Sequence, residues 1–181
     1  MHPVVQRLHR DHEHLDRVLD LLESHLDAFH DGEPIDYELV AQVLEYLADY
    51  ADCVHHRLED HLFEGLKERP DALGALVRQV MSQHPHLSAR TRQFQRTAEG
   101  VVQDAVVTRE EFEQQARAFL GLQREHLRLE EQRLLPQLET LLGGEALDAA
   151  AQLLPADQDP LFGTQRREQL MRLFARLARG G

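Results

Sequence analysis

A pattern rich in histidine and glutamate occurs twice in the sequence, at nearly the same internal spacing. The first copy begins His12-Glu13-His14-Leu15 and continues, forty-three residues after His12, with His55-His56-Arg57-Leu58-Glu59-Asp60. The second begins His84-Pro85-His86-Leu87 and continues, forty-two residues after His84, with His126-Leu127-Arg128-Leu129-Glu130-Glu131. In both copies a histidine precedes a glutamate by four residues, which on a helix places imidazole and carboxylate on the same face. These two groups together are ligands for divalent metal ions.

Six of these side chains could enclose two metal ions inside a four-helix bundle. Glu59 and Glu130 fall within or beside the apolar face of their helices, where a carboxylate is costly unless it is paired or bound to metal. Taken singly, a core histidine is usually structural and an i, i+4 Glu–His pair is often a surface pair, but the repetition of all six favours a shared site. The predicted metal ligands are His12, His55, Glu59, His84, His126 and Glu130. A nitrogen and oxygen set without thiolate suits iron or manganese, with zinc as the commoner contaminant.

The other histidines are interpreted as solvated or supporting residues, with His9 and His61 kept as reserve ligands. His56 and Asp60 are predicted to point away from the apolar stripe that Glu59 adjoins. Tyr46 and Tyr50 lie one turn apart and are interpreted as core packing, with a supporting role near the metal ions as the alternative for Tyr50.

Four long helices must position these ligands, and the chain predicts them over 3–30, 36–68, 72–102 and 109–142. Pro3 suits a first helical position, Asp36 an N-cap, and Thr108 with Glu111 a capping box. Each helix carries an apolar stripe at three- and four-residue spacing. Pro85 is expected to kink the third helix beside His84, and Pro136 to bend the end of the fourth. A short helical piece over about 145–154 and an amphipathic helix from Thr164 are predicted to follow.

Length and composition predict an all-α fold, and the helices predicted along the chain suit a four-helix bundle with an additional C-terminal amphipathic helix. The 181 residues suit one domain, divided into a bundle over 1–143 and a helical extension over 144–181. Residues 164–181 carry a net charge of +4, so the other 163 carry −16. This basic helix is expected to pack on the acidic bundle or to form a homodimer interface.

Charge and cysteine content limit the partners and the compartment. The net charge of −12 argues against nucleic acid as a partner, because phosphate binding needs a basic surface. The single Cys53 cannot form an internal disulfide and suits a reducing compartment. The sequence shows neither the hydrophobic region of a signal peptide nor an apolar run long enough to span a membrane. We therefore expect a cytoplasmic protein.

With these residues in hand, the chain resembles the hemerythrin-like family of HHE cation-binding domains, in a bacterial branch. The resemblance runs from about His12 to Pro136 and includes Asp11-His12, the His55–Glu59 pair, His84 and the His126–Glu130 pair. It implies an up-and-down four-helix bundle around a non-heme centre of two iron ions with carboxylate and oxo bridging. It also implies that the centre binds or reacts with dioxygen, NO or peroxide.

The sequence departs from the oxygen-carrying members in two places. Those proteins have a second histidine in an H-x-x-x-H pair on the third helix, where this chain has Val80 and Ser88 on either side of His84. They also have H-x-x-x-x-D on the fourth helix, where this chain has His126-x-x-x-Glu130. Six protein ligands instead of seven would leave more positions open, which favours redox reactivity over reversible oxygen carriage.

Three functions remain open from the sequence. The first is a protein that binds or senses a small oxidant, and therefore is not an enzyme. The second is a di-iron redox enzyme of the peroxidase, ferroxidase or NO reductase type. The third is an interaction module in which the metal ion is structural.

Overall fold

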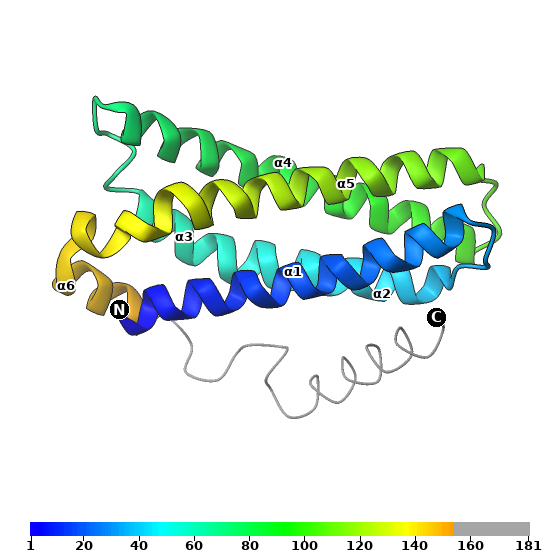
Figure 1. Cartoon of the computed structure of the whole chain (residues 1–181), viewed down its shortest axis with the longest axis horizontal. Coiled ribbons are helices and arrows are strands. Elements are labelled where there is room, and N and C mark those ends of the chain that lie inside the picture. The colour runs from blue at the N-terminus through cyan, green and yellow to red at the C-terminus, as the bar shows by residue number, and fades with distance from the viewer. Residues whose placement is uncertain (154–181) are drawn as a thin grey trace.

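The computed structural model describes residues 1–153, except for the side chains of residues 52, 53 and 153. Residues 154–181, which hold the predicted last helix and its dimer surface, lie outside the described residues. Within the described range the chain is helical, has no strand, and forms an up-and-down four-helix bundle (Figure 1). The all-α four-helix bundle predicted from the sequence is therefore confirmed.

The first two helices form a hairpin along one side of the bundle. Helix α1 covers Pro3–His30 and begins with Pro3 in its first turn, as predicted. Helix α2 covers Tyr37–Leu47, and the side chain of its N-cap, Asp36, accepts a hydrogen bond from the backbone N–H of Leu39. The chain then continues without a break through a π-helical segment, η1 (Ala48–His55), into α3 (His56–Phe63). The predicted second helix is thus three segments, and it ends at Phe63 instead of residue 68.

The second hairpin lies against the first. Helix α4 covers Ala72–Val102 and remains one helix through Pro85. Helix α5 covers Arg109–Leu129 and begins with the predicted capping box of Thr108 and Glu111. A second π-helical segment, η2 (Glu130–Leu134), connects α5 to α6 (Leu135–Leu153). Gly143 interrupts α6 with φ 72°, where the sequence predicts the fourth helix to end, because this left-handed conformation suits glycine.

The apolar interior consists of two separate clusters, one toward each end of the bundle. The cluster beside the α1–α2 turn contains Leu22, Leu44, Phe94, Phe112 and Phe119, among other residues. The cluster at the opposite end contains Leu8, Phe63, Val80, Leu134 and Leu147, among others. Leu147 lies after Gly143, so the second half of α6 covers this end of the bundle, beside the N-terminus (Figure 1). No helix within residues 1–153 has both the length and the apolar character needed to cross a membrane.

Candidate metal centre

Buried histidines and glutamates fill the level between the two apolar clusters. They form two groups of four residues, and within each group one possible ligand atom per residue lies within 4.8 Å of the others. Glu59 belongs to both groups. The first group is His12, His55, Glu59 and Glu130, and the second is His56, Glu59, His84 and His126.

Glu130 also approaches the second group. Its Oε2 lies 3.4 Å from His12 Nε2 and 3.3 Å from His126 Nε2, while its Oε1 lies 3.7 Å from His84 Nε2. Glu59 likewise lies 3.2 Å from His55 Nε2 and 3.6 Å from His84 Nε2. Each carboxylate therefore spans the two groups, and all six ligands predicted from the sequence come together.

His56 is the residue that the sequence interpretation missed. It is buried and its ring stacks on that of His84, with centroids 4.3 Å apart and an interplanar angle of 7°. The prediction that His56 points away from the stripe is therefore wrong. Glu59 is four residues after His55 and three after His56, so at about 100° per residue its direction falls between the two histidines. The run His-His-x-x-Glu was the signal, because one carboxylate can then meet an imidazole on each side.

A π-helical segment lies directly before His56 and changes the register of the apolar stripe there. A π turn hydrogen-bonds from i to i+5 and takes in one residue more than an α turn. After this segment the helix therefore has two inward sides. One carries Val54, Leu58 and Leu62, and the other carries the buried residues His56, Glu59 and Phe63. Such segments are frequent at functional sites, and here η1 ends at the first of the two adjacent histidines.

The reserve ligands do not join either group. His9 Nδ1 lies 2.8 Å from Glu131 Oε2, and that carboxylate also meets His12. His61 is exposed on α3. Because His56 brings the set to seven side chains, the inference that a missing seventh ligand favours redox reactivity loses its premise. The fifth histidine, His56, therefore comes from the second long helix of the bundle, at the start of α3, and not from α4, where the oxygen-carrying proteins have it.

Four of the five histidines have an outer polar partner at Nδ1, on the side away from the two glutamates. An acceptor there holds the proton on Nδ1 and leaves the Nε2 lone pair free to face a metal ion. Asp60, which the sequence interpretation also turned away from the site, is one of these partners. The four pairs are His12 with Glu131 at 2.8 Å, His55 with Asp11 at 3.5 Å, His84 with Asp60 at 2.8 Å, and His126 with Gln83 at 3.0 Å.

Asp11 is itself held by two further residues. Arg7 Nε lies 3.2 Å from both of its carboxylate oxygens, and Tyr50 also makes a side-chain hydrogen bond to Asp11. Arg7 Nη2 in turn donates to the Tyr50 hydroxyl over 3.3 Å. Burial acts to raise the pKa of Asp11, but these partners and His55 bring it below its usual value. The carboxylate behind His55 is therefore ionised and fixed in place.

The two central glutamates remain ionised although both are fully buried. Burial acts to raise the pKa of each, and for Glu130 the charge of Glu59 acts in the same direction. The surrounding histidines outweigh these effects, so the pKa of Glu130 falls to about 2 and that of Glu59 lies well below its usual value. Two adjacent buried carboxylates need positive charge between them, which protons on histidine or metal cations supply.

Several inward-facing polar atoms are arranged as metal ligands would be, and not as members of a hydrogen-bond network. Buried polar atoms are nearly always hydrogen-bonded in proteins. At this level, four buried side chains within the described range nevertheless have inward-facing atoms with no hydrogen-bond partner. These atoms are Glu59 Oε2, His84 Nε2, His126 Nε2 and both carboxylate oxygens of Glu130. Because they point at one another across contacts of 3.3–3.7 Å, the residues present fit divalent cations.

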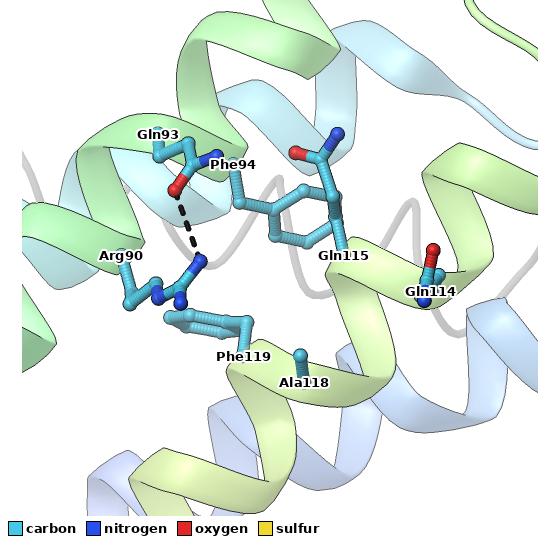
Figure 2. A pocket seen from close by; sticks show the side chains of 7 residues that line it. All are labelled: Arg90, Gln93, Phe94, Gln114, Gln115, Ala118 and Phe119. Atoms are coloured by element: carbon cyan, nitrogen blue, oxygen red, sulfur yellow. Dashed lines mark hydrogen bonds between the residues drawn. The ribbon is translucent and has the colours of Figure 1, made fainter.

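A separate groove lies between α4 and α5, beyond the level of the histidines. Figure 2 shows Phe94 and Phe119 with Arg90 and Gln93, whose side chains are joined by a hydrogen bond of 3.2 Å. The groove has a volume of about 270 Å³. No member of the two metal-ligand groups lines it, so the groove is not the metal centre.

Comparison with protein families agrees with this geometry. Residues 4–138 match the model of the hemerythrin HHE cation-binding domain, a range that contains all seven histidines and glutamates of the two groups. Searches of curated proteins and of solved structures give no match. A helical bundle whose buried centre is built from histidine and glutamate, matched over this range, belongs to the hemerythrin HHE cation-binding domain family.

Proposed function

We propose that the protein holds two iron ions between its four helices and uses them to bind or sense a small oxidant, namely dioxygen, NO or peroxide. The observation that carries this proposal is the position of Glu59, which belongs to both groups of candidate ligands. A carboxylate shared in this way can bridge two cations, and Glu130 offers the same contacts from the opposite hairpin. Iron bound here would supply redox electrons and an open coordination position.

The two groups differ in how many histidines they offer. His12 and His55 serve the first position, whereas His56, His84 and His126 serve the second. If both glutamates were shared by the two ions, the first position would have fewer protein ligands. An exogenous small molecule would therefore bind on the side of His12 and His55, where fewer coordination positions are filled.

The chain's own residues would orient the imidazoles and exclude water. Asp11, Glu131 and Asp60 hold three histidines by Nδ1 with charged acceptors, whereas Gln83 holds the fourth with a neutral amide. The apolar clusters on both sides of the centre keep bulk water away from the buried carboxylates. This surrounding is suited to a small uncharged ligand such as dioxygen or NO.

The test is metal content per chain, with absorption spectra before and after exposure to air. We expect two irons per chain and ferric bands after oxidation. Glu59→Ala and the isosteric Glu59→Gln should each lose two-metal binding, whereas Glu125→Ala, at an exposed position on α5 paired with Arg128, should retain it. A Glu59→Ala protein that still holds two irons would refute the bridging role.

Turnover measurements then separate binding from catalysis. We expect the loaded protein to bind NO or dioxygen stoichiometrically. Steady-state consumption of peroxide or Fe(II) faster than by free iron would instead support the redox enzyme. Stoichiometric zinc with no spectrum that depends on oxidation would support a structural metal ion.

A further inference from the structure

The groove between α4 and α5 has an apolar floor and a polar rim. The rings of Phe94 and Phe119 form the floor, with centroids 5.7 Å apart and an interplanar angle of 42°. Arg90 and Gln93 on α4 and Gln115 on α5 stand above these rings and form the rim (Figure 2). An apolar base with a few polar groups around it is the usual construction of a small-molecule site.

The size of the groove limits such a ligand to a single ring. The volume is about 270 Å³, and a cavity of about 150 Å³ holds benzene. Ala118 lies on the α5 side of the groove and is exposed, so its small side chain leaves the groove open to solvent. An aromatic ring with one short polar substituent therefore fits against the two phenylalanine rings.

Arg90 supplies a positive charge at the rim that no carboxylate of the described residues pairs with. Its Nη1 donates to Gln93 Oε1 over 3.2 Å, which holds the guanidinium in place. Within residues 1–153 no protein group accepts from its Nε or Nη2, and these two atoms form the fork that binds a carboxylate through two parallel hydrogen bonds. The arginines of α5 are different, because each of them pairs with a carboxylate. They are Arg109, Arg117, Arg124 and Arg128.

The surface around the groove also favours an anion. Residues 72–98 of α4 hold four arginines and no aspartate or glutamate, although the whole chain carries a net charge of −12. The α5 residues that line the groove are all uncharged. Thr97 donates to Gln115 Oε1 over 2.8 Å, so the amide N–H groups of Gln115 remain as donors for a ligand. One arginine and neutral amides match a ligand with a single negative charge.

We propose that the groove between α4 and α5 binds a small aromatic monocarboxylate, a molecule of the benzoate class, at a site separate from the metal centre. The ring of the ligand lies against Phe94 and Phe119, and its carboxylate accepts hydrogen bonds from Nε and Nη2 of Arg90. Such a ligand uses both parts of the groove, because its ring buries apolar surface while its charge meets the guanidinium. This inference goes beyond the proposed function and does not depend on which metal ion is bound.

The experiment titrates benzoate into the iron-loaded full chain and follows binding by calorimetry. We expect one saturable site with a Kd of about 1 mM, because a small ligand in an open groove gains little contact area. Benzamide has the same shape without the charge, and acetate has the charge without the ring. Each of these two compounds should bind about tenfold more weakly than benzoate, or not detectably.

Two substitutions test the two parts of the site separately. Arg90→Gln removes the charge and should weaken benzoate binding about tenfold. Its matched control is Arg92→Gln, at an exposed arginine of α4 that does not line the groove, which should leave the affinity unchanged. Ala118→Leu fills the groove and should abolish binding, whereas Ala89→Leu, at an exposed position on α4 outside the groove, should not. All four positions are exposed, so the core stays intact, and the urea midpoint of unfolding checks this.

The absence of saturable binding, or equal affinity for benzoate and benzamide, would overturn the proposal. An equal loss in Arg90→Gln and Arg92→Gln would overturn it too, because general charge attraction would then explain the binding. Binding that survives both Arg90→Gln and Ala118→Leu would place the carboxylate on the bound metal ions instead of in the groove. Each of these results leaves the proposed function standing, since the metal content is measured separately.

Discussion

Removal of the Asp60 carboxylate should weaken binding of the metal ion held by His84. Asp60 Oδ1 accepts the Nδ1–H of His84 over 2.8 Å and thereby fixes the ring and its tautomer. Burial acts to lower the pKa of His84, but Asp60 and the two central glutamates raise it to about 10. The same contacts make the imidazole a stronger ligand once a metal ion replaces its Nε2 proton.

The size of this effect follows from the exposure of Asp60. Loss of an outer partner of a metal-bound histidine typically costs about 10- to 100-fold in metal affinity. The Asp60 side chain is 44% exposed, so water can replace the lost acceptor. We therefore expect Asp60→Ala to weaken binding about tenfold, or about 1.4 kcal/mol.

Competition with a chromophoric chelator for zinc measures the change without redox chemistry. Asp60→Asn should recover most of the affinity, because its amide oxygen can still accept from Nδ1. Glu64→Ala is the matched control, since that carboxylate follows α3 and is 62% exposed in an ion pair with Lys67. Unchanged affinity in Asp60→Ala, or an equal loss in Glu64→Ala, would refute the reasoning.

Three further predictions concern the seventh ligand, pH and packing. His56→Ala should lower the metal content below two ions per chain. His61→Ala, a control at an exposed position on α3, should leave the metal content unchanged. Elemental analysis of the two purified variants measures both. The pKa of His55 is raised to about 9 and that of His84 to about 10, against the effect of burial. Chelator-treated protein therefore carries these protons at pH 7 and must release them to bind metal. The metal affinity should therefore rise with pH. Calorimetry in buffers of different ionisation enthalpy should detect the released protons. Phe119→Ala removes a ring that is 2% exposed and should cost about 3–5 kcal/mol in urea unfolding, and a loss below 1 kcal/mol would contradict the packing described.

Local signals in the sequence predicted the helices well because helix ends depend on neighbouring residues. Pro3, Asp36 and the pair of Thr108 with Glu111 each act within one turn, and the structure places each where the pattern predicts. The repeated His–Glu spacing likewise predicted that the six candidate ligands lie at one level of the bundle. This worked because neighbouring helices of an up-and-down bundle run side by side.

The features that sequence reasoning missed depend on register between distant segments. A π-helical turn requires a shift in backbone hydrogen bonding that no single residue type signals, so the segment η1 was not expected. The contact between Gln83 and His126 joins residues forty-three positions apart. Its existence depends on the axial offset of two helices, which an apolar stripe does not specify.

The separation of the interior into two apolar clusters has a mechanical consequence. A bundle with one continuous core resists bending along its whole length, but this one carries a plane of seven polar side chains across its middle. In that plane, side-chain attraction between the hairpins depends on charge instead of apolar contact. Metal ions bound by residues of both hairpins would link the hairpins at this plane. The two ends of the bundle would then unfold in one transition. Loss of the metal would turn the same plane into the weakest cross-section of the molecule.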